Sequence, residues 1–136
     1  MGHEMRQPEN PILIVDDEER ALTSIRITLQ LAGLTNLRTC SDGRDAYAML
    51  SRETFSLVLL DLHMPNVSGH QILRQAAALN NAPPVLIVTA SVLVRDFVEC
   101  EAAGMADYIV KPLDRDRLIG AVRAALARPA TGKMTE

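Results

Sequence analysis

The sequence lacks several features that mark common functional classes. Its two cysteines, Cys40 and Cys100, do not have the paired spacing of a metal site or a disulfide framework, so we expect reduced thiols. A net charge of -3 provides no basic surface for nucleic acid. The chain has no signal segment and no apolar run near the ~20 residues of a membrane span. We therefore expect a cytoplasmic domain that binds neither a membrane nor nucleic acid directly.

The length and composition predict a single folded domain. The 136 residues suffice for one hydrophobic core and are too few for two. Apolar residues make up 48% of the chain and charged residues 23%, the usual balance of a globular protein. We expect a flexible lead at 1–10, a domain at 11–127, and a flexible tail or the start of a linker at 128–136.

Strand-like and helical patterns alternate five times along the chain. Apolar runs predict strands at Ile12–Val15, Leu37–Cys40, Ser56–Leu60, Val85–Thr89 and Tyr108–Val110. Helical spacing and breakers predict helices at Glu18–Ala32, Ser41–Leu50, Ser68–Leu79, Ser91–Ala103 and Asp114–Ala127. Short connections favour an α/β fold, a doubly wound parallel sheet with helices on both faces. Five strands and right-handed crossovers favour the flavodoxin-like (βα)5 order 2-1-3-4-5.

Polar residues follow four of these strands at their C-terminal ends. They are the pair Asp16 and Asp17, then Asp61, Thr89 and Lys111. Because the carboxyl ends of parallel strands share one edge, which carries the binding crevice in open sheets, we expect these side chains to converge. Two carboxylates ~5 Å apart repel by ~3 kcal/mol at an effective dielectric of ~20. The cluster therefore requires a divalent cation, and an all-oxygen donor set suits Mg2+ and the handling of a phosphoryl group.

Four motifs around these positions resemble those of one family. They are Ile14-Val15-Asp16-Asp17-Glu18, Asp61-Leu62-His63-Met64-Pro65 with Ser68-Gly69, Val88-Thr89-Ala90, and Tyr108-Ile109-Val110-Lys111-Pro112. In this order and on these elements, they resemble the receiver domain of two-component response regulators, from about Pro11 to Ala127. The resemblance implies a chemotaxis-regulator-like fold. It also implies a signalling switch that catalyses only its own phosphorylation and dephosphorylation.

The resemblance assigns the acidic residues to two tasks. Asp61 would be the phosphoacceptor, because a carboxylate can attack phosphorus and hold the phosphoryl group as an acyl phosphate. Mg2+ would be bound directly by Asp17 and Asp61, largely through water by Asp16, and by the backbone carbonyl of His63. Asp16 and Asp17 also precede a helix, where they can act as caps.

The remaining motif residues would contact the phosphoryl group or change conformation when it is present. Lys111 would pair with Asp61 beforehand and then with a phosphoryl oxygen, and Pro112 resembles the family's cis-proline. Thr89 would donate a hydrogen bond to the phosphoryl group and move toward it. Tyr108 would be an aromatic switch that turns inward when Thr89 moves; a buried strand tyrosine is the alternative.

The resemblance also predicts partners and an output face. The donor would be a phosphohistidine on a sensor histidine kinase or a phosphotransfer protein. The output face would combine the predicted helix Ser91–Ala103, strand Tyr108–Val110 and helix Asp114–Ala127, with a possible homodimer through it. Since neighbours in a helix diverge by ~100°, Val92, Leu93 and Val94 cannot all point inward, and at least one should be exposed. The inward stripe would use Leu93, Phe97 and Cys100, or Val94, Val98 and Ala102.

Other readings of the residues differ in testable ways. A phosphatase of the haloacid dehalogenase type would carry its nucleophile after the first strand, whereas Asp61 follows the third. A flavodoxin-like cofactor binder would need a Gly-, Ser- or Thr-rich loop where Asp16-Asp17-Glu18-Glu19 stands. A degenerate receiver, acting as a phosphorylation-independent interaction module, would have lost key side chains, and none is missing. The histidines carry weaker signals: His63 fits an exposed loop residue, and His3 and His70 have no companion at ligand spacing.

Overall fold

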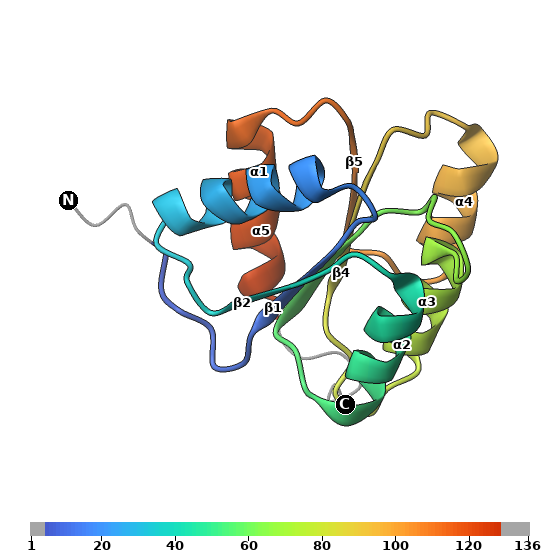
Figure 1. Cartoon of the computed structure of the whole chain (residues 1–136), viewed down its shortest axis with the longest axis horizontal. Helices are drawn as coiled ribbons and strands as arrows, with labels where there is room; N and C mark the ends of the chain where they lie inside the picture. The colour runs from blue at the N-terminus through green and yellow to red at the C-terminus, as the bar shows by residue number, and fades with distance from the viewer. Residues whose placement is uncertain (1–4, 129–136) are drawn as a thin grey trace.

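The computed structural model describes residues 5–128, in which strands and helices alternate as predicted (Figure 1). The strands are β1 (Ile12–Val15), β2 (Leu37–Cys40), β3 (Leu57–Leu60), β4 (Val85–Thr89) and β5 (Asp107–Val110). The helices are α1 (Glu19–Leu31), α2 (Gly43–Arg52), α3 (Gly69–Ala77), α4 (Val94–Ala102) and α5 (Arg115–Leu126). All paired strands are parallel, in the order β2-β1-β3-β4-β5. The predicted fold class and strand order are confirmed.

The sheet is covered on both faces, which explains its uninterrupted apolar strands. Helices α1 and α5 lie on one side, and α2, α3 and α4 lie on the other (Figure 1). In β1, Ile12 and Ile14 belong to the core that contains α1 and α5. Leu13 and Val15 alternate with them and belong to the core beneath α2, α3 and α4. Each side chain of the strand is therefore buried, as expected for a parallel sheet inside two helical layers.

Helix α4 begins at Val94, later than the predicted start at Ser91. Side chains compete for the backbone donors in front of it: Ser91 N donates to Thr89 Oγ1 at 3.3 Å, and Leu93 N donates to Ser91 Oγ at 3.2 Å. Such local bonds favour a turn over a helix. The predicted helix was therefore too long at its N-terminal end.

Helix α4 and the loop before it present an apolar surface to solvent. Val92, Leu93 and Val94 are all exposed, so the prediction that at least one would be is confirmed. Neither predicted inward stripe is observed. The buried residues of α4 are Asp96 and Cys100, because α4 turns a mixed polar face toward α3.

Part of the predicted lead contacts the domain. Met5 N donates to the carbonyl of Ala32 at 3.0 Å, and Asn10 N donates to Ser56 Oγ at 3.0 Å. Residues 1–4 and 129–136 lie outside the described part, so the flexible lead and tail stay predictions. Among residues 5–128, no helix combines the length and apolar character needed to cross a membrane.

Gly69 allows α3 to start directly against the end of β3. Its N–H donates to the carbonyl of Leu62 at 2.9 Å. A Cβ at this position would clash with the carbonyl oxygen of Asp61 and lie 2.6 Å from Leu62 Cα. Because both neighbours are backbone, the chain following β3 would have to move. The lack of a side chain at Gly69 thus permits this close packing against the backbone of Asp61 and Leu62.

We expect Gly69→Ala to lower the free energy of unfolding by about 1–3 kcal/mol, the usual effect of overpacking. Gly120→Ala is the matched control, because an added Cβ at this exposed helical position meets nothing within 4 Å. That control should stabilise α5 by up to ~1 kcal/mol. Urea unfolding of both variants measures the difference, and a Gly69→Ala protein as stable as the wild type would contradict the packing described.

Candidate functional site

The sheet register brings the predicted polar residues to one edge. Asp61 N donates to the carbonyl of Val15 at 3.0 Å, which places the end of β3 beside the end of β1. Lys111 N donates to the carbonyl of Thr89 at 2.8 Å, which joins β5 to β4 in the same way. These backbone bonds continue the parallel ladders by one residue beyond the strands. Residues from four strands therefore meet at the carboxyl edge.

Three carboxylates form the centre of this edge. Oxygen atoms of Asp16, Asp17 and Asp61 all lie within 4.8 Å of one another. Asp16 and Asp61 are buried, whereas Asp17 is exposed. A compact group of oxygen donors with one side open to solvent fits Mg2+, which retains several waters when protein-bound.

Lys111 lies closer to Asp16 than to its predicted partner. Its Nζ is 2.6 Å from Asp16 Oδ2 and 3.5 Å from Asp61 Oδ2. The other oxygen of Asp16, Oδ1, accepts from Glu18 N at 3.0 Å, so both Asp16 oxygens are satisfied. The Lys111 ammonium thus bridges the Asp16 and Asp61 carboxylates, and its shorter contact is with Asp16, the more buried of the two. The Lys111–Pro112 peptide bond is cis, as the resemblance implies.

The electrostatics of this pair follow from its burial. Burial raises the pKa of Asp16, with Asp61 adding a smaller rise, while the ammonium of Lys111 and the Glu18 N–H oppose the shift. Burial alone would lower the pKa of Lys111. Its hydrogen bond to Asp16 and the charges of both carboxylates outweigh that effect and raise the pKa. Lys111 therefore carries its positive charge at neutral pH.

Ser91 connects Thr89 with Tyr108. Thr89 is fully buried, and its Oγ1 accepts from Ser91 N. Tyr108 Oη donates to the carbonyl of Ser91 at 3.1 Å, and burial raises the pKa of this hydroxyl, which keeps it a donor. The Tyr108 ring is partly buried and meets Phe97 edge-on, with ring centroids 5.3 Å apart. The two predicted switch residues, Thr89 and Tyr108, are thus both hydrogen-bonded to Ser91.

Asp96 is a buried charged residue that the sequence analysis missed. Its Oδ2 accepts from Ser91 Oγ at 2.5 Å and lies 3.2 Å from His63 Nε2. The Ser91 hydroxyl lowers the pKa of Asp96 most; burial opposes this, and His63 and His70 assist it. An acidic residue within a helical segment is typical of a solvated position, and Asp96 is buried because α4 packs against α3 and the loop after β3.

His63 lies beside the acidic edge with an exposed ring. Its backbone N–H is 3.4 Å from Asp61 Oδ1. The position follows Asp61 by two residues, as the motif requires. The role of its backbone carbonyl in metal binding stays a prediction.

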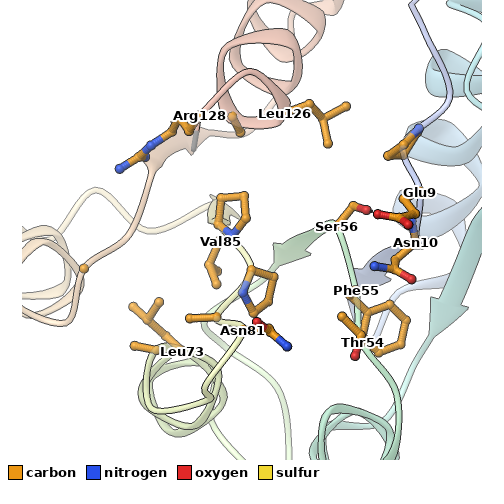
Figure 2. A pocket seen from close by; sticks show the side chains of 17 residues that line it. Glu9, Asn10, Thr54, Phe55, Ser56, Leu73, Asn81, Val85, Leu126 and Arg128 are labelled. Atoms are coloured by element: carbon orange, nitrogen blue, oxygen red, sulfur yellow. Dashed lines mark hydrogen bonds between the residues drawn. The ribbon is translucent and has the colours of Figure 1, made fainter. Parts of the chain in front are cut away.

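A cavity of about 760 Å3 lies at the other end of the sheet (Figure 2). Ser56 and Val85, at the N-terminal ends of β3 and β4, line it together with Phe55, Leu73 and Leu126. Its lining holds no cluster of carboxylates. The cavity is not part of the candidate site, because the full length of the strands lies between it and the acidic edge.

Residues 12–123 match the family model described as the response regulator receiver domain. Since this match spans well over half of the chain, the protein belongs to the response regulator receiver domain family. The predicted family is confirmed.

Curated relatives agree with this assignment. The transcriptional regulatory protein ZraR of Salmonella typhimurium is 40% identical over 116 residues, which cover 85% of this chain and 26% of ZraR. The response regulator ArlR of Staphylococcus saprophyticus is 36% identical over 117 residues, covering 86% of this chain and 52% of ArlR. The chain thus spans between about a quarter and about half of these relatives.

Solved receiver domains share the fold. A CheY-like receiver domain protein from Methanospirillum hungatei superposes with a TM-score of 0.80 at 27% identity, covering 86% of this chain and 93% of that chain. The receiver domain of the sensor histidine kinase PA1611 from Pseudomonas aeruginosa has a TM-score of 0.79 at 28% identity, covering 89% of this chain and 100% of that chain. The latter structure contains a magnesium ion in its active-site cleft.

We expect Lys111→Met to destabilise the metal-free protein by about 3 kcal/mol, because it leaves the buried Asp16 carboxylate without its cation. The pKa of Asp16 would then rise further above its unfolded value. A raised folded-state pKa stabilises the folded protein at low pH, and this contribution is lost as the pH rises. The deficit relative to the wild type should be largest near neutral pH and shrink toward acid pH.

Urea unfolding without divalent cations at neutral and mildly acid pH measures this deficit. Arg38→Met is the matched control, since it removes an exposed ion pair with Glu53 at 2.8 Å. That change should amount to no more than ~1 kcal/mol and lack the pH trend. A Lys111→Met deficit that is equal at both pH values would argue against the Asp16 pairing.

Proposed function

We propose that this domain is a phosphorylation-dependent switch in which Asp61 accepts a phosphoryl group from a partner phosphohistidine. The partner would be a sensor histidine kinase or a phosphotransfer protein. The observation that carries the proposal is the position of Asp61 at the end of β3, within 4.8 Å of Asp16 and Asp17 and 3.5 Å from Lys111 Nζ. Membership in the receiver family supports it, because phosphorylation-dependent signalling is what that family implies.

The transfer is a displacement at phosphorus. A carboxylate oxygen of Asp61 attacks in line, its bond to phosphorus forms, and the bond between phosphorus and the donor imidazole nitrogen breaks. The electron pair of that bond stays on the imidazole. Lys111 moves its ammonium from the carboxylates to a phosphoryl oxygen, and the Thr89 hydroxyl donates to another. Water later attacks the phosphorus atom, the bond between phosphorus and the Asp61 oxygen breaks, and inorganic phosphate leaves as Asp61 returns to a carboxylate.

Mg2+ would be held by Asp16, Asp17, Asp61 and the backbone carbonyl of His63. When bound, it supplies positive charge that offsets the crowding of carboxylate and phosphoryl oxygens. The all-oxygen cluster of this chain and the magnesium ion in the cleft of the PA1611 receiver domain support this choice.

Ser91 provides a route from the site to the rest of the domain. If Thr89 Oγ1 turns toward the phosphoryl group, the contact from Ser91 N must change. The same residue accepts from Tyr108 Oη and donates to Asp96 on α4. The loop before α4 and the Tyr108 ring would therefore respond together.

The output surface we propose is α4-β5-α5. Large apolar side chains are exposed on α4, in the loop before it and on β5: Val92, Leu93, Val94, Phe97, Val98 and Val110. A grouped apolar surface of this kind suits a protein partner or a homodimer. The net charge of -3 argues against direct binding of nucleic acid by this domain. A phosphorylation-independent module is disfavoured, since no predicted key side chain is missing.

We expect incubation with Mg2+ and a small phosphodonor to add one phosphoryl group to the wild type and none to Asp61→Asn. Omitting Mg2+ should abolish the reaction, since the phosphoryl charge would meet three uncompensated carboxylates. Asp116→Asn, which changes an exposed carboxylate of α5, should react like the wild type. Intact-protein mass spectrometry reads the added mass, and equal phosphorylation of Asp61→Asn would place the nucleophile elsewhere.

We also expect beryllofluoride with Mg2+ to change amide hydrogen exchange across 92–104 and at Tyr108 more than across 42–50. The physical reason is the shared contact of Thr89 and Tyr108 with Ser91. The Asp61→Asn variant should show no such change. Effects confined to the loops around Asp61, with α4 silent, would reject α4 as the responding element.

A further inference from the structure

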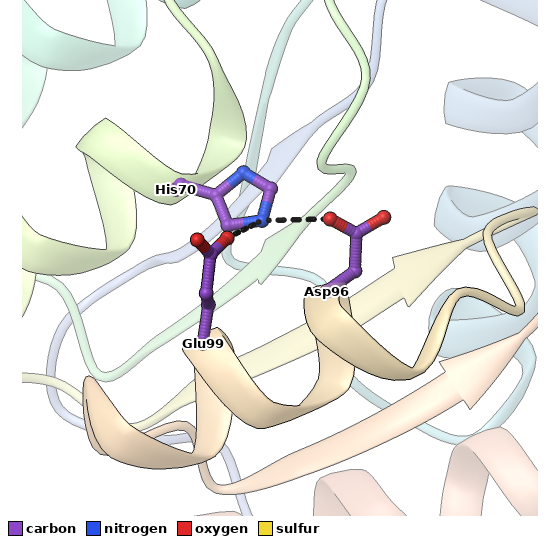
Figure 3. A group of neighbouring side chains, drawn as sticks. All are labelled: His70, Asp96 and Glu99. Atoms are coloured by element: carbon purple, nitrogen blue, oxygen red, sulfur yellow. Dashed lines mark ion pairs between the residues drawn. The ribbon is translucent and has the colours of Figure 1, made fainter.

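A second group of metal-ligating side chains joins α3 to α4, away from the acidic edge. His70 comes from α3, and Asp96 and Glu99 come from successive turns of α4 (Figure 3). His70 Nε2 lies 3.2 Å from Asp96 Oδ1 and 3.3 Å from Glu99 Oε1. One ligand atom from each of the three residues lies within 4.8 Å of the other two.

The imidazole nitrogen at the centre of this group has no hydrogen-bond partner. His70 Nε2 is buried, and although both carboxylates are near, neither is aligned with it for a hydrogen bond. Ligand atoms ~2.05 Å from a tetrahedral Zn2+ lie ~3.3 Å from one another. The two separations from Nε2 match that spacing, whereas good hydrogen bonds would be shorter and linear.

The surroundings of Asp96 leave one of its oxygens for an ion. Oδ2 is held by Ser91 Oγ at 2.5 Å and lies 3.2 Å from His63 Nε2. Oδ1 faces His70. Outer contacts of this kind orient a carboxylate ligand in metal sites. Glu99 is exposed and gives an ion a path from solvent.

We propose that His70 Nε2, Asp96 Oδ1 and Glu99 Oε1 form a binding site for a divalent transition metal, with Zn2+ as the ion best suited. One imidazole and two carboxylates provide three protein ligands, and water takes the fourth position. The imidazole favours Zn2+ and its neighbours in the series over Mg2+, which the all-oxygen acidic edge suits instead. The ion pins α4 against α3. This site does not use Asp61, so its test is separate from that of the proposed phosphorylation.

Calorimetric titration of the full chain with Zn2+, in excess Mg2+ to occupy the acidic edge, tests the site. We expect one Zn2+ per chain in the wild type and binding at least ~10-fold weaker in His70→Gln and in Glu99→Gln. Glu101→Gln, an exposed glutamate of the same helix, and His3→Gln are matched controls that should bind like the wild type. Asp17→Asn should also retain the site, since it changes only the acidic edge.

Side-chain 15N NMR of the wild type gives a reading that needs no variant. Zn2+ should shift the ring nitrogens of His70 and leave those of His3 unchanged. The proposal is overturned if no Zn2+ binds in the presence of Mg2+, or if binding persists at full strength in His70→Gln. Loss of binding in Asp17→Asn alone would likewise overturn it, by placing the ion at the acidic edge.

Discussion

Negative charge crowded at one sheet edge is the constraint on which this domain depends. Among residues 5–128, Asp16, Asp17 and Asp61 lie together, and the ion pairs of Lys111 with Asp16 and Asp61 balance only part of their charge, so negative charge is in excess. Burial of Asp16 increases the cost of this imbalance. In the function we propose, a divalent cation would offset this excess charge, and an incoming phosphoryl group would add negative charge again. In that proposal, the same edge would hold the ion, accept the phosphoryl group and change its contacts when that group arrives.

Ser91 connects the acidic edge of the sheet with helix α4. Its backbone meets Thr89 and Tyr108, and its hydroxyl meets Asp96. The hydrogen bonds of Ser91 also hold the loop in a non-helical conformation, so that α4 begins at Val94. In the proposed switch, a change at Thr89 would therefore reach α4 through the contacts of Ser91. Asp96 extends the chain of contacts to His63 and His70, which lie in or next to α3.

Much of the fold could be predicted because its signals are local. Continuous apolar runs such as Leu57–Leu60 indicated strands buried on both faces, and short connections indicated parallel order. The start of α3 near Ser68 was likewise predicted, and Ser68 caps this helix in a capping box with Gln71. The start of α4 could not be predicted from helical periodicity. The Ser91 hydroxyl accepts from Leu93 N, and a side-chain bond of this kind leaves no trace in the spacing of apolar residues.

The sequence by itself determined which residues occupy the carboxyl ends of β1, β3, β4 and β5, because strand ends and parallel order follow from local patterns. It did not determine that Lys111 lies nearer Asp16 than Asp61, since that choice depends on burial and on which oxygens are already bound. Nor did it reveal His70 beside Asp96 and Glu99. His70 is far along the chain from Asp96 and Glu99, and only the packing of α3 against α4 brings its side chain to theirs.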